Sequence, residues 1–107
     1  MTDEPTRTEL TTLDALDGAP HAEVFDRRDP RVVRLALDAG ERVPAHRHPE
    51  ANVVAYLVSG RLDLSLDDET HELRAGDAIR FDGRREVSPR AVERSVALLV
   101  LAPKANG

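Results

Sequence analysis

The stretch GERVPAHRHPEANVVAYLVSG, residues 40–60, decides how the rest of this 107-residue chain is interpreted. A glycine stands at each end, and five residues after the first glycine come His46 and His48, two positions apart. Side chains two apart on a β-strand point to the same face, so a strand here would present two imidazoles to one metal ion or one ligand. The stretch therefore indicates a metal site, or the remainder of one.

The composition excludes several classes of protein. The length predicts one domain with one core. The chain has no cysteine, which excludes a disulfide scaffold, a thiolate zinc site and a cysteine nucleophile. The net charge is −5 and no basic face stands out, so we expect no nucleic-acid partner. The polar N-terminus and the short apolar runs predict a cytoplasmic protein with no membrane partner.

Short apolar runs separated by turn residues fill most of the chain. Turns every eight to twelve residues indicate an all-β sandwich or barrel of eight or nine short strands. The only helix candidate is TELTTLDAL, in a loosely ordered arm over residues 1–20 that precedes a barrel domain over residues 21–107. The runs that we assign as strands include residues 21–26, 31–38, 43–48, 52–60, 61–69, 78–82 and 95–103.

The opening stretch resembles the first conserved motif of the cupin superfamily. That motif runs glycine, five residues, His-x-His, three or four residues, glutamate, six residues, glycine, and Gly40, His46, His48 and Gly60 match it. LRAGDAIRF, residues 73–81, is similar to the start of the second cupin motif, which opens with Gly-Asp. The resemblance implies an all-β, cupin-type jelly-roll β-barrel of two antiparallel sheets, of the small, single-domain, type-2 conserved-barrel kind. It also implies a homodimer, because small cupins commonly pair through their sheets.

The metal motif that the resemblance implies is degenerate. The family's metal-binding glutamate falls at Val53, or at Asn52 if the loop is one residue shorter. The third histidine falls at Val87. Two of the four usual ligands are therefore replaced, and His46 and His48 remain.

Two functions stay open. In the first, His46 and His48 bind a divalent transition metal (Fe, Mn, Ni, Cu or Zn) for an oxygenase or isomerase. The third ligand is then unassigned. Glu50 has the right parity but follows Pro49, and His71 shares parity with an apolar core position.

In the second function, which we favour, the chain is a non-enzymatic small-molecule-binding or sensing barrel. Its ligand would lie in an apolar lumen with the two histidines at the mouth. No catalytic residue is assigned, because the chain has neither GxSxG nor GxGxxG. His21 is expected to be solvated, and Tyr56 to pack outside the lumen. The predicted lumen residues are Val33, Leu35, Leu37, Val53, Ala55, Leu57, Ile79, Phe81 and Val87.

Overall fold

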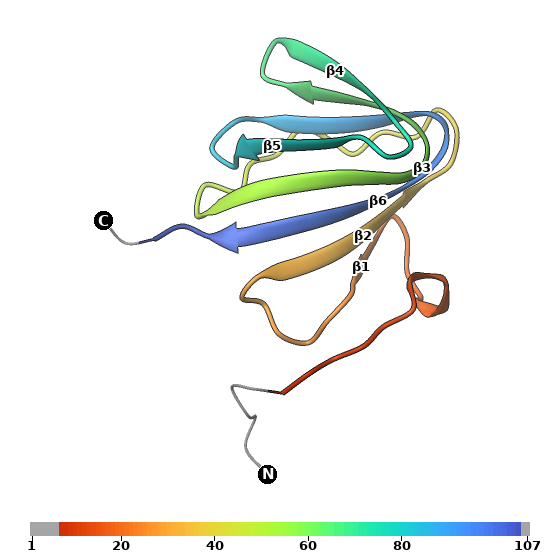
Figure 1. Ribbon diagram of the computed structural model, residues 1–107. Helices are drawn as coiled ribbons and strands as arrows, with labels where there is room; N and C mark the ends of the chain where they lie inside the picture. The colour runs from red at the N-terminus through yellow and green to blue at the C-terminus, as the bar shows by residue number, and fades with distance from the viewer. Residues whose placement is uncertain (1–6, 106–107) are drawn as a thin grey trace.

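Antiparallel strands make up most of residues 7–105, the part of the chain that the computed structural model describes (Figure 1). This confirms the predicted all-β fold class. A single turn of 3₁₀ helix, η1 (Leu13–Ala15), lies in the N-terminal arm where a helix of about two turns was considered. The strands of this part are β1 (His21–Glu23), β2 (Arg31–Leu37), β3 (Ala51–Leu66), β4 (Glu69–Arg74), β5 (Ala78–Asp82) and β6 (Val87–Pro103).

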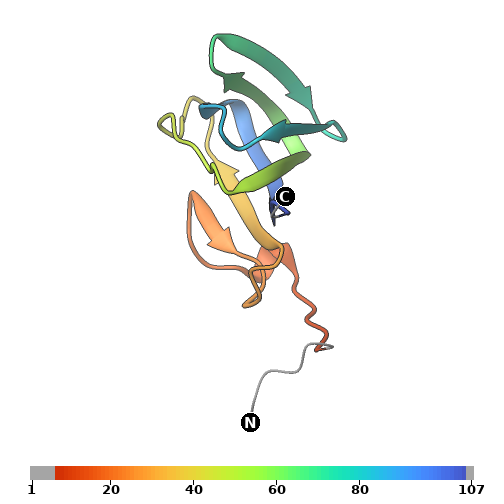
Figure 2. The same ribbon diagram turned by 90° about the vertical axis from the view of Figure 1, so that its left-hand side faces the viewer.

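Two long strands, β3 and β6, hold the barrel together. The strand order is β1-β2-β6-β3-β4, and β5 pairs with the first half of β3 while β4 pairs with its second half. β3 and β6 pair along their whole length, with register shifts between Leu57 and Leu62. Each long strand therefore bends near its middle, which curls the single six-stranded sheet into the jelly roll, as Figure 2 shows.

The bend lies at residues 59–61 of β3 and 93–95 of β6, which we call the corner. Gly60 has φ of +91°, and a Cβ added to it would lie 2.2 Å from the carbonyl oxygen of Arg94. The Ser95 side chain is buried and its Oγ accepts a hydrogen bond from the Arg61 N–H at 3.1 Å. The same hydroxyl lies 2.9 Å from the Arg61 carbonyl and 2.8 Å from the Glu93 carbonyl. Only glycine at position 60 lets the two backbones approach this closely.

The alternation along the strands places the core where the sequence predicts it. Eight of the nine predicted lumen residues are buried, and the ninth, Ile79, packs partly buried against them. Tyr56 faces outward and is 42% exposed, as expected from its opposite parity. The core extends through the second half of β3, β4 and the length of β6, with Leu62, Leu64, Leu66, Leu73, Ala91, Ala97 and Leu101.

Several predicted strand boundaries were wrong. The separate strands predicted at 52–60 and 61–69 are one strand, because β3 bends at Gly60 without ending. Residues 43–48 form no strand; Arg42 and His46 make only isolated bridges to β6. Pro44 has no N–H to donate to a ladder, so the segment runs as a loop across the barrel end.

The N-terminal arm lies against the outer face of β2. Arg34 of β2 donates from Nη1 to the Leu13 carbonyl at 2.8 Å and from Nη2 to the Gly18 carbonyl at 2.7 Å. Residues 1–6 of the predicted arm and the last two residues of the predicted domain are outside the described residues. No helix within the described part is long and apolar enough to cross a membrane.

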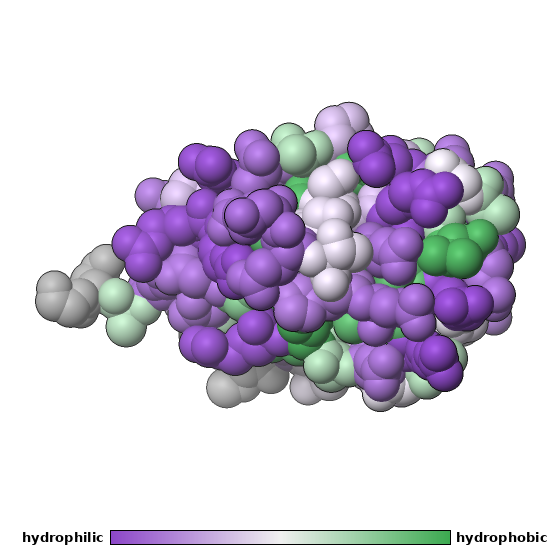
Figure 3. All heavy atoms as spheres, turned by 90° about the horizontal axis from the view of Figure 1, so that it is seen from above, coloured by the Kyte–Doolittle hydropathy of each residue, from purple (hydrophilic) through white to green (hydrophobic). Residues whose placement is uncertain are grey.

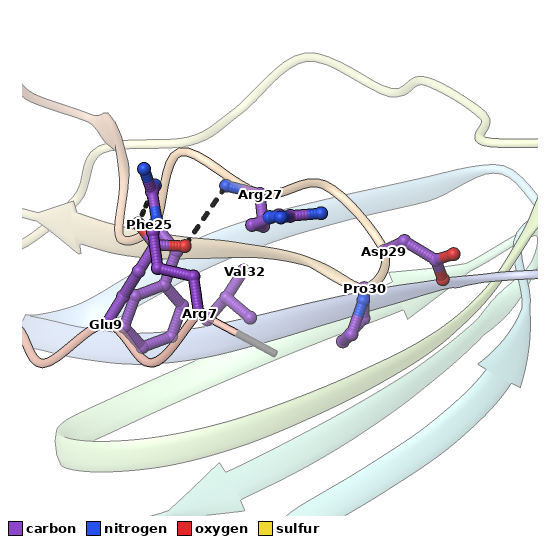
Figure 4. A pocket seen from close by; sticks show the side chains of 7 residues that line it. All are labelled: Arg7, Glu9, Phe25, Arg27, Asp29, Pro30 and Val32. Atoms are coloured by element: carbon purple, nitrogen blue, oxygen red, sulfur yellow. Dashed lines mark hydrogen bonds and ion pairs between the residues drawn. The ribbon is translucent and has the colours of Figure 1, made fainter. Parts of the chain in front are cut away.

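A hollow of about 450 Å³ lies where the arm meets the loop that follows β1 (Figure 4). The Glu9 carboxylate accepts hydrogen bonds from the backbone N–H groups of Asp26 and Arg27 at 3.0 and 3.4 Å. It also pairs with Arg7 at 3.4 Å. These contacts fasten the arm to the barrel, so we assign this hollow to arm docking.

Candidate functional site

The segment 43–50, which we call the mouth loop, carries His46 and His48 and is fixed by β5 and β6. His46 and Val87 exchange backbone hydrogen bonds of 3.1 and 2.9 Å. The His48 N–H donates to the Gly83 carbonyl at 2.7 Å. Gly83 is buried, and a Cβ added to it would lie only 2.0 Å from the His48 carbonyl oxygen. The loop can therefore lie this close to β5 only because residue 83 is a glycine.

A lysine holds the far end of the mouth loop. Lys104, the only lysine of the chain, donates from Nζ to the Pro49 carbonyl at 3.0 Å and to the Asp82 carboxylate at 2.7 Å. Its backbone N–H donates to the Glu50 carbonyl at 3.0 Å. The Lys104 ammonium, followed by the N–H and guanidinium of Arg84, holds the pKa of Asp82 well below its usual range. Both ends of the loop are thus anchored to neighbouring strands.

The His46 and His48 rings lie side by side at the barrel mouth, as the sequence predicts. Their centroids are 4.7 Å apart and the rings are nearly perpendicular. His46 Nδ1 lies 2.8 Å from the Pro44 carbonyl oxygen. A carbonyl only accepts, so Nδ1 donates there, and in the neutral ring Nε2 has a free lone pair. Burial, then the charges of His46 and Arg31, lowers the pKa of His48, which favours the neutral form at pH 7.

A third histidine, His21, faces the same cavity. It lies on β1 opposite the core residue Leu35, and it lines the lumen together with His46 and His48. Burial, then the charges of His46 and Arg31, lowers the pKa of His21. The sequence interpretation missed this role: His21 is exposed as expected, but it is exposed toward the mouth. Local alternation could not have found it, because apolar Ala22 and Val24 suggest the opposite face for His21; only the pairing of His21 with Leu35 places it at the lumen.

The lumen is narrow and apolar. Its cavity volume is about 30 Å³, which is room for one or two water molecules. A much larger groove, of about 500 Å³, opens over the same three histidines on the outer side of the mouth. A small molecule would therefore have to sit over the mouth. The groove is also lined by Arg31, Val33, Val43, Pro44, Ala45, Leu99 and Leu101.

The structure places both lost metal-ligand positions at the cavity. Val53 and Val87 line the lumen beside His46 and His48, but their side chains have no donor atom. Asn52 is the neighbour of Val53 on β3 and has the opposite parity. The set that the family resemblance implies therefore has only two of its four ligands, and it does not fit a four-ligand metal site.

The predicted third ligands do not complete the site either. Glu50 is exposed and lines, with His48, the neighbouring groove and not the lumen cavity. His71 lies on β4, outside the cavity lining, with Nε2 3.6 Å from the Glu69 carboxylate. In the described part of the chain, no three His, Asp or Glu side chains lie close enough together to hold a metal ion.

Comparisons with known proteins agree with this architecture. Residues of this chain are 41% identical over 70 positions to "Polyketide synthase CurC" of Streptomyces cyaneus, covering 61% of this chain and 46% of that protein. The chain thus spans less than half the length of this relative. The fold matches the KdgF structure from Halomonas sp. with a TM-score of 0.79 and 19% identity, over 94% of this chain and 97% of that one. It also matches an RmlC-like cupin from Shewanella frigidimarina, with a TM-score of 0.76, 15% identity and coverage of 94% and 95%.

The match to a family is direct. The family model described as "Cupin domain" matches residues 33–101, which run from within β2 to near the end of β6 and include the mouth loop. This range contains both histidines of the first motif and the Gly76-Asp77 turn of the second. On this match and on its jelly-roll barrel, the chain belongs to the cupin family.

Proposed function

We propose that this cupin is a non-enzymatic protein that binds or senses a small molecule over the barrel mouth. The observation that carries the proposal is the convergence of His21, His46 and His48 on one groove, while the positions of the lost metal ligands hold valines. Three imidazoles offer both hydrogen-bond donors and acceptors when neutral, which suits the polar end of a ligand. The apolar side chains of the groove suit its body.

Removal of the histidines tests this proposal. Untagged protein is analysed by native mass spectrometry for a bound small molecule, and the molecule is then added back to the ligand-free protein in a calorimetric titration. We expect the His46→Ala/His48→Ala double variant to fold normally and to lose at least tenfold in affinity for that molecule. His71→Ala, a matched control outside the cavity, should bind as the parent does. If the affinity of the double variant were unchanged, the mouth would not be the binding site.

A second candidate is a metal-dependent oxygenase or isomerase. It is favoured by the free Nε2 lone pair of His46, and it requires His21, which lines the same groove but does not lie close enough in the structure, to move toward the pair as a third imidazole. Fe, Mn, Ni, Cu or Zn would suit imidazole ligands. Elemental mass spectrometry separates the candidates: about one metal equivalent per chain, lost in His21→Ala, would replace the binding proposal. Metal far below stoichiometry that soaking with excess Zn²⁺ does not restore would exclude the enzyme.

We also propose that the chain forms a homodimer through the outward face of the first half of β3 and the second half of β6. Val54, Tyr56 and Val58 of β3 are between 37% and 42% exposed on this face. Tyr56 and Val54 pair with Leu98 and Val100 of β6, which extends the apolar surface across two strands. By contrast, the face in Figure 3, seen from above the β4 end, is mainly hydrophilic with only separate apolar patches. Light scattering should give twice the chain mass, and Tyr56→Glu should give the monomer mass.

A further inference from the structure

Two grooves meet at the barrel mouth and form one trough. The groove over the three histidines and a neighbouring groove of about 500 Å³ share Arg31, His48 and Leu101. We call the two together the mouth trough. One arm of the trough is largely apolar, with Val33, Val43, Pro44 and Leu99 among its lining residues. The other arm carries more charged side chains and is lined by Arg28, Arg47, Pro49, Glu50, Ala51 and Pro103 in addition to the shared residues.

Cationic side chains face this trough although the chain as a whole carries a net charge of −5. Three arginines line it against one carboxylate, that of Glu50. The carboxylates that pair with two of these arginines, those of Glu23 and Glu86, are not among the lining residues. A ligand in the trough would therefore meet guanidinium groups first.

Arg31 is the arginine whose position is best defined. It is the first residue of β2, on the same face of the strand as the core residues Val33, Leu35 and Leu37, and it pairs with Leu101 of β6. Its Nε donates to the Glu23 carboxylate at 2.8 Å, and Glu23 belongs to the inward face of the neighbouring strand β1. This contact and a second one through Nη2 orient the guanidinium, whose side chain remains 33% exposed. A guanidinium has five N–H donors in a planar fork, so donors remain for a second, anionic partner.

We propose that the mouth trough binds a small organic anion with an apolar body, with its anionic group on Arg31 beside His48 and its body along Val43, Pro44 and Leu99. The inference rests on the proposed function, because it names the chemical class of the ligand that the mouth accepts. Because the lumen is too small for more than one or two water molecules, the body of the ligand would lie in the trough. A charge-assisted hydrogen bond to Arg31 then discriminates an anion from a neutral molecule of the same shape.

Hexanoate and hexan-1-ol, which share an apolar tail and differ in charge, are the probes for this proposal. Each is titrated into ¹⁵N-labelled protein in the presence of EDTA, and the amide shifts of the trough residues give the affinity. We expect hexanoate to bind at least fivefold more tightly than hexan-1-ol. Arg31→Gln should weaken the affinity for hexanoate five- to tenfold and leave the affinity for hexan-1-ol unchanged. Arg80→Gln removes the same charge from an exposed position of β5 and should change neither affinity.

The outcomes separate the inference from the proposed function. If both probes bind with equal affinity, or if Arg31→Gln does not change the affinity for hexanoate, the proposed preference for an anion is wrong. The mouth then remains a binding site. If neither probe shifts any trough residue, the ligand class proposed for the trough is wrong, and the titration of the His46→Ala/His48→Ala variant decides the proposed function separately. If hexanoate binds only when EDTA is replaced by Zn²⁺, the anion is bound by a metal ion and the assignment to Arg31 is overturned.

Discussion

The corner and the mouth of the barrel are both built on a close backbone approach at a glycine, but they leave their side chains in opposite situations. At the corner Ser95 is 2% exposed, and its hydroxyl lies within hydrogen-bond distance of three backbone groups. At the mouth the His46 and His48 rings are partly exposed, and one backbone carbonyl orients His46. The corner closes the Ser95 hydroxyl on the protein itself, whereas the mouth fixes its backbone and leaves imidazole nitrogens facing the groove.

This difference indicates what each region contributes. The satisfied, buried hydroxyl of Ser95 at the corner stabilises the bend that makes a sheet into a barrel. Anchored backbone with unsatisfied, exposed side chains is the arrangement expected of a binding site on a rigid scaffold. Substitutions at the corner should therefore reduce the stability of the whole fold, and substitutions at the mouth should act more locally.

The largest effect is expected from Gly60→Ala at the corner. The added Cβ would overlap the Arg94 carbonyl, and the residue would also keep a left-handed φ. We expect a loss of about 3 kcal/mol or more in the free energy of unfolding. That loss corresponds to a decrease of more than about 12 °C in Tm for a domain of this size. Because the chain has no tryptophan, unfolding in urea is followed by circular dichroism.

Gly40→Ala is the matched control for this substitution. Gly40 also has a left-handed φ, +85°, but a Cβ added to it would meet nothing within 4 Å. Gly40→Ala should lower the free energy of unfolding by only about 1 kcal/mol, which is the backbone strain alone. Equal losses in the two variants would show that the close approach at Gly60 contributes nothing to the stability of the corner.

A smaller and more local effect is expected from Gly83→Ala at the mouth. The added Cβ would overlap the His48 and Ala51 carbonyl oxygens at 2.0 and 2.5 Å, so the mouth loop has to move. We expect a loss of about 1–3 kcal/mol in stability. The ring resonances of His46 and His48 should shift in NMR spectra, while those of His71 on β4 should not. A shift of all three rings would contradict a local role for Gly83.

The sequence predicts the fold because the barrel depends on repeated, local signals. The alternation of Val53, Ala55 and Leu57, and of the leucines that follow Gly60, defines which face is buried, and the family motif defines the order of the strands. The continuity of β3 through Gly60 could not be predicted in the same way. A glycine after a strand is equally typical of a turn, and only the neighbouring backbone of β6 makes it a bend.

The site was predicted only in part, for a different physical reason. His46 and His48 are two residues apart, so one local segment predicts that they lie together. His21 reaches the same groove through the pairing of β1 with β2, which brings it opposite Leu35, and no local pattern contains that contact. Arg31 joins the trough through a different non-local pairing, that of β2 with β6, which places it opposite Leu101.

The smallest effect is expected from Lys104→Met, which tests whether the mouth loop needs its anchor at Pro49. Loss of the ammonium should raise the pKa of Asp82 toward its usual value of about 3.9, measured by NMR titration of the carboxyl carbon. Arg84→Met should raise it less, because Lys104 is the larger cause of the shift.

The sign of the accompanying pH dependence follows from the depressed pKa. The Asp82–Lys104 pair stabilises the folded chain fully above the unfolded pKa of about 3.9, and this contribution is lost as the pH falls through the lower, folded pKa. The urea midpoints of the parent and Lys104→Met should therefore differ most near pH 7 and converge in acid. A residual difference in acid is expected from the hydrogen bond of Lys104 to the Pro49 carbonyl, which does not depend on the charge of Asp82. A difference that stays constant with pH would mean that Lys104 anchors the mouth loop through Pro49 alone.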